Sequence, residues 1–174
     1  MVGIREAQKS DVADMAAIYN HAVRTSNATF DIEESTLEQR MEWFSHYGGR
    51  HPLLVAEVQG RIAGYSCLSP FRTKPAYAHT AELSVYIDPL YQGQGLGKAL
   101  VKELLTRAKE LKYHAIVAGI TGGNHTSIRL HEAFGFTLVG HFKEIGHKFG
   151  TWQDVFFYEL LLENDHPPLR PDTP

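Results

Sequence analysis

The sequence predicts a single α/β (α+β) domain in which a central mixed, mostly antiparallel, twisted sheet is flanked by helices. Short β-rich runs and amphipathic helical runs follow one another in mixed order, with no internal repeat. A chain of 174 residues with 43% hydrophobic content is long enough for one compact core, and a second full domain would not fit. We assign residues 1–162 to this domain. Residues 163–174 are rich in proline and polar groups, and we expect them to form a tail that buries too little apolar surface to order itself.

Charge and composition exclude several classes of protein. The net charge is −3, from 17 basic and 20 acidic residues, so there is no cationic excess of the kind that drives nucleic-acid binding. Residues 1–8 carry no apolar targeting segment, and no apolar run approaches the ~20 residues that cross a bilayer. Cys67 has no cysteine partner, which suits a reducing compartment, and we predict a packed strand residue rather than a nucleophile. We therefore expect a cytoplasmic protein with no membrane association and no metal site.

The first elements are a short strand and two helices. Residues 4–7 form the strand, and Ser10 or Asp11 offers an oxygen that can cap the first helix. A second helix is predicted after the polar residues 24–34, because Ser35-x-x-Glu38 and Thr36-x-x-Gln39 both have capping-box spacing. The apolar positions of the two helices are Val12, Met15, Ala16, Ile18 and Tyr19, and then Leu37, Met41, Trp43 and Phe44.

The middle of the chain predicts a hairpin, a strand and a long helix. Residues 53–58 and 61–69 are β-rich runs separated by Gln59-Gly60, which indicates a tight turn. Residues 71–77 lie between prolines and form a loop before the strand at residues 82–88, which Pro89 ends. The long helix is predicted from one apolar stripe that consists of Leu96, Leu100, Leu104, Ala108 and Leu111.

The last third of the chain completes the sheet. Residues 114–120 predict a buried strand, and Gly122-Gly123 breaks it. A short helix at residues 127–134 stops at Gly135. Two further strands are predicted around residues 137–142 and 155–162.

A glycine-rich segment, Gln92-Gly93-Gln94-Gly95-Leu96-Gly97, joins the strand at residues 82–88 to the long helix. Glycines let backbone N–H groups converge on a phosphate, and the helix N-terminus adds partial positive charge. The same glycines would also permit a tight turn with no ligand. A P-loop is excluded because it needs glycine at Gln92 and a hydroxyl residue at Ala99, and a dinucleotide fingerprint is excluded because it needs glycine at Lys98.

The remaining pattern, Gln-x-x-Gly-x-Gly between a strand and a helix, resembles the pyrophosphate-binding signature of the GNAT superfamily of N-acetyltransferases. The resemblance is nearest to the phosphinothricin and methionine sulfoximine N-acetyltransferase branch, and it covers nearly the whole chain up to Leu162. Further similar stretches are Ile18-Tyr19-Asn20, Leu54-Val55-Ala56-Glu57, Thr80-Ala81-Glu82-x-Ser84-Val85-Tyr86, Ser127-x-Arg129-Leu130-His131-Glu132 with Gly135-Phe136, and Gly146-x-Lys148-x-Gly150-x-Trp152-x-Asp154-Val155.

The resemblance implies a GNAT-like domain that transfers an acetyl group from acetyl-CoA to the amine of a small molecule. In this branch the acceptor is the α-amine of a glutamate-like amino acid: L-methionine sulfoximine, methionine sulfone or phosphinothricin. The pyrophosphate would lie at residues 93–98, and backbone groups of residues 85–87 would contact the pantetheine arm. The cofactor-binding residues that the resemblance implies are Val85, Tyr86, Ile87, Gln92, Gly93, Gln94, Gly95, Leu96, Gly97, Lys98, Asn124 and Ser127.

Two side chains are candidates for proton transfer. An ammonium group has no lone pair for attack on a thioester, so a base must accept its proton. The resemblance places that base at Glu82, which we expect to open its strand among apolar neighbours that would raise its pKa if it is buried. Without the resemblance, an exposed strand-end carboxylate would be the simpler interpretation. Many relatives carry a tyrosine as general acid where this chain has His131, so His131 or solvent is expected to protonate the thiolate.

The acceptor is expected to bind at a loop before the catalytic strand. The resemblance implies contacts from the residues Phe30, Arg72, Thr73, Lys74, Glu82, Leu83 and Ser84. A planar guanidinium such as that of Arg72 can hold a carboxylate with two hydrogen bonds, and Phe30 can act as a lid or anchor its own loop to the core. The branch also implies a homodimer. The alternatives are a GNAT enzyme for another small amine, such as a polyamine or an antibiotic, an enzyme for a protein N-terminus, and a non-catalytic CoA-binding module.

Overall fold

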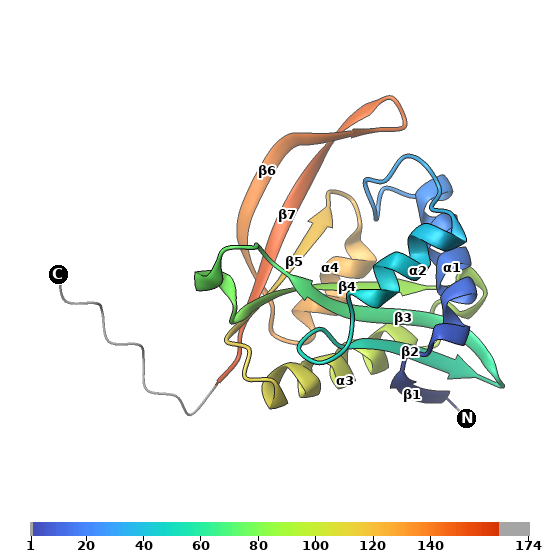
Figure 1. Ribbon diagram of the computed structural model, residues 1–174. Coiled ribbons are helices and arrows are strands. Elements are labelled where there is room, and N and C mark those ends of the chain that lie inside the picture. The colour runs from blue at the N-terminus through green and yellow to red at the C-terminus, as the bar shows by residue number, and fades with distance from the viewer. Residues whose placement is uncertain (1, 164–174) are drawn as a thin grey trace.

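The computed structural model describes residues 2–163, which form a seven-stranded sheet with helices on both faces (Figure 1). Apart from Glu163, the predicted tail lies outside the described residues. The strands are β1 (Val2–Glu6), β2 (Leu53–Val58), β3 (Arg61–Pro70), β4 (Thr80–Ile87), β5 (Ala115–Thr121), β6 (Thr137–Lys148) and β7 (Thr151–Leu161). The α-helices are α1 (Val12–Thr25), α2 (Leu37–Ser45), α3 (Leu96–Glu110) and α4 (His125–Glu132). Short 3-10 turns, η1 (Lys9–Asp11), η2 (Pro75–Tyr77) and η3 (Pro89–Tyr91), precede α1, β4 and the glycine segment.

The strand order is β1-β2-β3-β4-β5-β7-β6. Neighbouring strands run antiparallel except β4 and β5, which run parallel. Between β4 and β5 the pairing covers three residue pairs and ends at Glu82 and Val117. The predicted mixed, mostly antiparallel sheet is therefore confirmed, and a break in its pairing lies at the centre.

Two apolar clusters hold the helices on opposite faces of the sheet. One cluster packs α3 and α4 against the strands, and the apolar stripe predicted for α3 is buried in it from Leu96 to Ala108. The other packs α1 and α2 against β2 and β3, and Cys67 is buried there as a small core residue. Burial of apolar area at roughly 25 cal/mol per Å² makes these two contacts the main favourable term in folding.

Local sequence signals set most of the element ends. The Thr36 side chain accepts a hydrogen bond from the Gln39 amide at 3.2 Å, and the Gln39 side chain accepts one from the Thr36 amide at 2.8 Å. Of the two capping boxes that the sequence allows, the structure therefore uses Thr36. Gln59 and Gly60 have φ of 51° and 77°, which matches the tight turn predicted between β2 and β3.

Several element boundaries differ from the prediction. Strand β4 begins at Thr80, so Glu82 is its third residue and does not open the strand. Helix α4 begins at His125, because Asn124 caps it, and ends at Glu132. Strands β6 and β7 form one long hairpin that turns at residues 149–150, where Phe149 and Gly150 have φ of 53° and 72°. A phenylalanine in the left-handed region is unusual, which is why the sequence did not indicate this turn.

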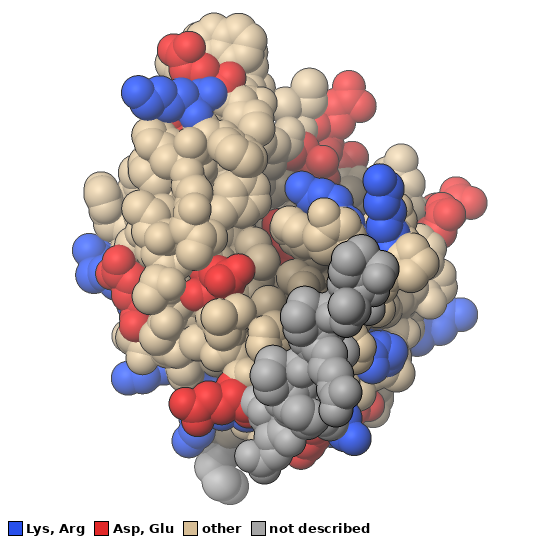
Figure 2. All heavy atoms as spheres, turned by 90° about the vertical axis from the view of Figure 1, so that its left-hand side faces the viewer, with Lys and Arg blue, Asp and Glu red and all other residues tan. Residues whose placement is uncertain are grey.

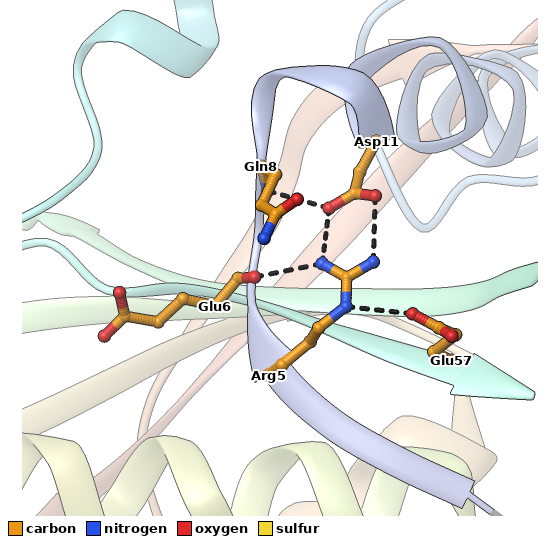
Figure 3. A network of polar contacts seen from close by, with 5 residues as sticks. All are labelled: Arg5, Glu6, Gln8, Asp11 and Glu57. Atoms are coloured by element: carbon orange, nitrogen blue, oxygen red, sulfur yellow. Dashed lines mark hydrogen bonds and ion pairs between the residues drawn. The ribbon is translucent and has the colours of Figure 1, made fainter. Parts of the chain in front are cut away.

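An ion-pair network joins the first two strands to the start of α1 (Figure 3). The Arg5 guanidinium donates to both oxygens of Asp11 at 2.7 and 3.0 Å and to Glu57 at 2.9 Å. Asp11 also accepts from the Gln8 amide at 2.7 Å. Burial by itself would raise the pKa of Asp11, but the hydrogen bonds from Arg5 and Gln8 outweigh it, and that pKa is lowered.

The β6–β7 hairpin projects from the body of the protein (Figure 1). The side of the molecule that Figure 2 shows is largely tan around the hairpin, with few charged groups there. The exposed large apolar side chains on this hairpin are Leu138, Val139, Phe142, Ile145, Phe149, Trp152 and Leu161. Among residues 2–163, no helix is long and apolar enough to span a membrane.

Candidate active site

The site begins where β4 and β5 separate. Beyond Glu82 and Val117, β4 keeps its pairing with β3, and β5 keeps its pairing with β7. A cavity of about 60 Å³ lies in this gap, lined by both strands and by the side of α4 that carries His131. Main-chain groups of β4 that point away from β3 therefore face a gap instead of a neighbouring strand.

A cleft of about 630 Å³ continues from the gap to the N-terminus of α3. Residues 85–87 of β4, the glycine segment and Lys98 line one side of it, and Asn124 and Ser127 line another. All the predicted cofactor-binding residues line this cleft except Gln94, whose side-chain amide instead donates to the Leu90 carbonyl at 3.3 Å. The structure therefore brings the predicted set together around one elongated space.

The glycine segment has the backbone conformation that an anion site needs. Gly93 and Gly95 have φ of +74° and +81°, and no heavy atom beyond the adjacent residues lies within 4 Å of the position that a Cβ would take on either residue. Gly95 is the N-cap of α3, whose first amides have no carbonyl partner within the helix. These open positions and free amides fit a pyrophosphate.

The N-terminus of α4 borders both the cleft and the gap. Asn124 caps this helix, because its Oδ1 accepts a hydrogen bond from the Ser127 amide at 3.2 Å. Both residues line the two spaces, so they can contact a ligand that runs from the cleft into the gap. The cap fixes the Asn124 side chain at that junction.

Glu82 lies at the point where the two strands separate. Its side chain is half-buried, and burial raises its pKa, while the positive charge of Arg72 opposes that rise. Gly119, on the facing part of β5, has an exposed backbone, and a Cβ there would lie 3.5 Å from Glu82 Oε1. That Cβ would also lie 3.3 Å from the Phe157 ring, so glycine at this position lets the carboxylate and the ring approach the β5 backbone closely. A half-buried carboxyl group with a raised pKa, beside Gly119 at the edge of the gap, is a candidate general base.

His131 is 3% exposed and lines the gap from α4. Its Nδ1 lies 2.8 Å from the Ser127 carbonyl oxygen, which can only accept, so Nδ1 carries the proton. Burial lowers the pKa of His131, and its buried Nε2 has no hydrogen-bond partner among the described residues. At neutral pH Nε2 of this ring is therefore a hydrogen-bond acceptor, and Nε2 would donate only after the ring gains a second proton. Its assignment as general acid stays a prediction.

The structure places the predicted acceptor residues in three parts of the fold. Arg72, Thr73 and Lys74 are exposed in the loop between β3 and β4, and Arg72 is near enough to lower the pKa of Glu82. The Leu83 side chain is buried in the core cluster beneath α3, so its backbone is what faces the gap. Ser84 also lines the gap, and the Phe30 ring lies against Gly146 on β6.

The sequence did not indicate the wall that α1 contributes to the cleft. The C-terminal part of α1 and the residues that follow it also line the cleft. The residues involved are Ile18, His21, Ala22, Thr25, Ser26, Asn27 and Ala28. They share no residue type or spacing that marks a ligand site, because the fold alone places them there.

The geometry defines a class of protein. A sheet that opens between parallel strands, beside free amides at a helix N-terminus, suits a long cofactor with phosphate at one end and a reactive group at the other. With a carboxylate at the gap, this arrangement is that of an acyl-CoA-dependent N-acyltransferase. Residues 4–157 match the family described as acetyltransferase (GNAT) domain, and the chain belongs to this family of acetyl-CoA-dependent N-acetyltransferases.

Comparison with known proteins agrees with this family. The chain is 37% identical over 169 residues to an L-methionine sulfoximine/L-methionine sulfone acetyltransferase of Salmonella typhimurium, with 95% of this chain and 97% of that protein covered. It is 40% identical over 166 residues to a phosphinothricin N-acetyltransferase of Streptomyces coelicolor, with 92% and 96% covered. A solved phosphinothricin acetyltransferase from Sinorhizobium meliloti, in complex with acetyl-CoA, has a TM-score of 0.90 at 33% identity, with 99% and 97% covered. The predicted family and its predicted likeness to this branch are confirmed.

Proposed function

We propose that this enzyme acetylates the α-amine of a glutamate-like amino acid that carries a tetrahedral sulfur or phosphorus group in its side chain. The acceptors are L-methionine sulfoximine, methionine sulfone and phosphinothricin, and we favour the two sulfur compounds. The observation that carries the proposal is the pair formed by Glu82, half-buried at the gap, and Arg72, exposed beside it. The names of the relatives support the class of acceptor.

In this proposal Glu82 is the general base. Acetyl-CoA supplies an acetyl group activated as a thioester. Glu82 takes the proton from the acceptor ammonium, directly or through water, and the amine nitrogen then attacks the acetyl carbon. A backbone N–H of residues 85–87 stabilises the negative charge that develops on the carbonyl oxygen. Collapse of the tetrahedral intermediate breaks the C–S bond, and the nitrogen releases its second proton to solvent. The thiolate that leaves takes its proton from His131 or from solvent.

Arg72 is the proposed anchor for the acceptor. Its guanidinium can donate two parallel hydrogen bonds to a carboxylate or to the oxygens of a side-chain head group. Lys74, in the same loop, offers a single point charge. Phe30 lies against Gly146 of the β6–β7 hairpin, and in this proposal its ring covers the bound acceptor.

A direct test is an acceptor screen with acetyl-CoA, in which released CoA thiol is measured. The acceptors are L-methionine sulfoximine, L-methionine sulfone, phosphinothricin, glutamate, the polyamine spermidine, and a peptide with a free N-terminus. We expect the three compounds with a tetrahedral head group to give the highest kcat/KM. The highest value on spermidine or on the peptide would contradict the proposed acceptor and leave the acetyltransferase family intact.

We also propose that the enzyme is a homodimer that pairs through the β6–β7 hairpin. The hairpin exposes several large apolar side chains, among them Val139 and Trp152, that a second copy can cover. Sedimentation at working concentration should show a dimer. Val139→Lys should shift it toward monomer, whereas Val2→Lys, at an exposed position on β1 at the opposite edge of the sheet, should not. A monomer in the unmodified protein would contradict this proposal.

A further inference from the structure

The segment between α1 and α2 has no helix or strand around Thr29, yet distant elements hold it in place. Thr121 Oγ1 on β5 donates to the Asn27 carbonyl at 2.6 Å, and Asn27 Nδ2 donates to Gln153 Oε1 on β7 at 3.0 Å. Lys148 Nζ on β6 donates to the Thr29 carbonyl at 2.8 Å. We call residues 27–31 the strap. Its position is set by the sheet strands at the far end of the chain.

Lys148 differs from the rest of its strand. Most of β6 is exposed, but Lys148 is 3% exposed. Lysine is rarely buried unless it is paired, and its long stem would allow the ammonium group to reach water at little cost. Here the ammonium group instead bonds the Thr29 carbonyl and lies near enough to Asp31 to be stabilised by its charge. Burial removes hydration from this ammonium group and so lowers the pKa of Lys148.

Gly146 provides a second contact with the strap. A Cβ on Gly146 would lie 2.3, 2.7 and 2.8 Å from three ring atoms of Phe30, so the ring occupies the space that any other residue would fill. Gly146 and Lys148 are two residues apart on β6 and therefore face the same side of the strand. One face of β6 thus holds both the backbone and the aromatic side chain of the strap.

A bulge in β6 sets this register. Phe142 pairs with Val155, and Gly146 pairs with Gln153. Over this stretch β6 therefore advances four residues where β7 advances two. The Asp154 carboxylate holds the bulge, because it accepts from the Glu144 amide at 2.8 Å and pairs with His141 at 2.7 Å. Without these extra residues Gly146 and Lys148 would lie at other positions along the strap.

The other side of the strap is held next to the reaction site. The Tyr19 hydroxyl bonds Thr29 Oγ1 at 2.9 Å and also bonds Asp31. Tyr19 lies edge-on to Tyr86, with ring centroids 5.3 Å apart, and Tyr86 lines both the cleft and the gap. Ala28, within the strap, also lines both spaces. The strap therefore spans from α1 to the hairpin across the end of the gap.

We propose that Lys148 is a positioning residue for acceptor binding: by holding the Thr29 carbonyl it fixes the strap, and with it the Phe30 ring, over the acceptor site. This inference rests on the proposed function, because it needs the acceptor to bind beside Phe30. Lys148 does not touch the reacting atoms. It acts through Thr29, and Gly146 acts with it by leaving room for the ring.

The test compares Lys148→Met with Lys143→Met, which changes an exposed lysine on the same strand. With L-methionine sulfone as acceptor, Lys148→Met should raise the acceptor KM at least tenfold, while the KM of acetyl-CoA and the Kd of CoA by calorimetry stay within twofold. Lys148→Arg, which keeps the charge and donors, should recover part of the loss. An unchanged acceptor KM, or equal increases for acceptor and acetyl-CoA, would overturn the inference.

A second variant tests the same inference in case Lys148→Met does not fold. In Gly146→Ala the new methyl group displaces the end of the flexible Phe30 side chain, so the protein should fold and show the same selective rise in acceptor KM. Gly140→Ala is the matched control, because its Cβ would make an ordinary contact of 3.8 Å with Phe157. Equal acceptor KM values in these two variants would contradict the proposed role of the strap in acceptor binding.

Hydrogen exchange separates this inference from the proposed function. In the enzyme without ligands, Lys148→Met should speed amide exchange of the strap relative to Lys143→Met. If the unmodified enzyme does not acetylate methionine sulfone, the proposed acceptor fails, and the same comparison of KM values is made with the acceptor that the screen identifies. Strap exchange that is equal in the two variants would refute the role of Lys148 whatever the acceptor is.

Discussion

Replacement of Glu82 by glutamine tests the proposed base with almost no change of shape. The amide cannot accept the ammonium proton, and general bases contribute typically 10²–10⁴ in rate. Because Glu82 is half-buried, solvent reaches the position and can partly replace the base, so we expect a loss in kcat of about 100-fold at neutral pH, or roughly 2.7 kcal/mol of transition-state stabilisation. The loss should shrink as pH rises, because a larger fraction of the acceptor is then already a neutral amine.

The assay is thiol release across a pH series, with acetyl-CoA binding measured in parallel by calorimetry. In the unmodified enzyme, activity should rise with pH through the pKa of Glu82, which burial raises above its ordinary value. Glu82→Gln should remove that rise and leave acetyl-CoA affinity within twofold. Glu159→Gln is the control, because Val117 pairs with both Glu82 and Glu159 and so places the two glutamates on the same face of the sheet. A Glu82→Gln enzyme with the unmodified rate and pH profile would refute the assignment.

Four further outcomes test the rest of the site and one part of the fold. Gly95→Val should weaken acetyl-CoA binding at least tenfold by calorimetry, because a β-branched residue at φ of +81° costs of order 1–3 kcal/mol; unchanged affinity in the folded variant would contradict the site. Arg72→Ala should raise the acceptor KM, leave that of acetyl-CoA nearly unchanged and shift the acid limb of the pH profile upward, because its charge lowers the pKa of Glu82; an unaffected acceptor KM would argue against an acidic acceptor. His131→Phe should keep most activity above neutral pH if solvent protonates the thiolate, and a large loss there would assign that step to His131. Asp11→Asn should lower Tm, with a cost of roughly 1.5–3 kcal/mol for charged hydrogen bonds; because the folded pKa of Asp11 is lowered, the stabilisation is present above the unfolded value of about 3.9 and is lost as pH falls, so the two Tm values should converge in acid.

Much of the fold follows from short-range patterns. The Thr36–Gln39 capping box, the turn at Gln59-Gly60 and the buried stripe of α3 depend on residues within a few positions of one another, and all three occur in the structure. The sequence prediction underestimated the length of the β6–β7 hairpin. Its length depends on cross-strand pairing and on Asp154, which holds a bulge ten residues away, and neither effect has a local periodic signal.

Part of the candidate site could likewise be predicted from the sequence, and part of it could not. The glycine segment could be located from sequence because backbone freedom and a helix start mark it locally. The wall formed by α1 and the strap could not, because its members, such as His21 and Ala28, become cleft residues only when α1 packs across β4. Lys148 is a similar case, since its sequence neighbours are exposed and its burial comes from contact with a loop more than a hundred residues earlier.

The early end of pairing between β4 and β5 gives this protein a sheet edge in its interior. An edge strand normally lies at the border of a sheet, where solvent or another chain can satisfy its main-chain groups. Here the edge of β4 after Glu82 lies at the centre, between strands that continue on either side. Occupation of this edge by the cofactor arm would complete the main-chain hydrogen bonding of the sheet, so the free energy of unfolding should depend on ligand concentration, with about 2.7 kcal/mol gained at 100 times Kd. The cellular supply of acetyl-CoA would then set how firmly the two halves of the sheet are held together as well as how fast the enzyme works.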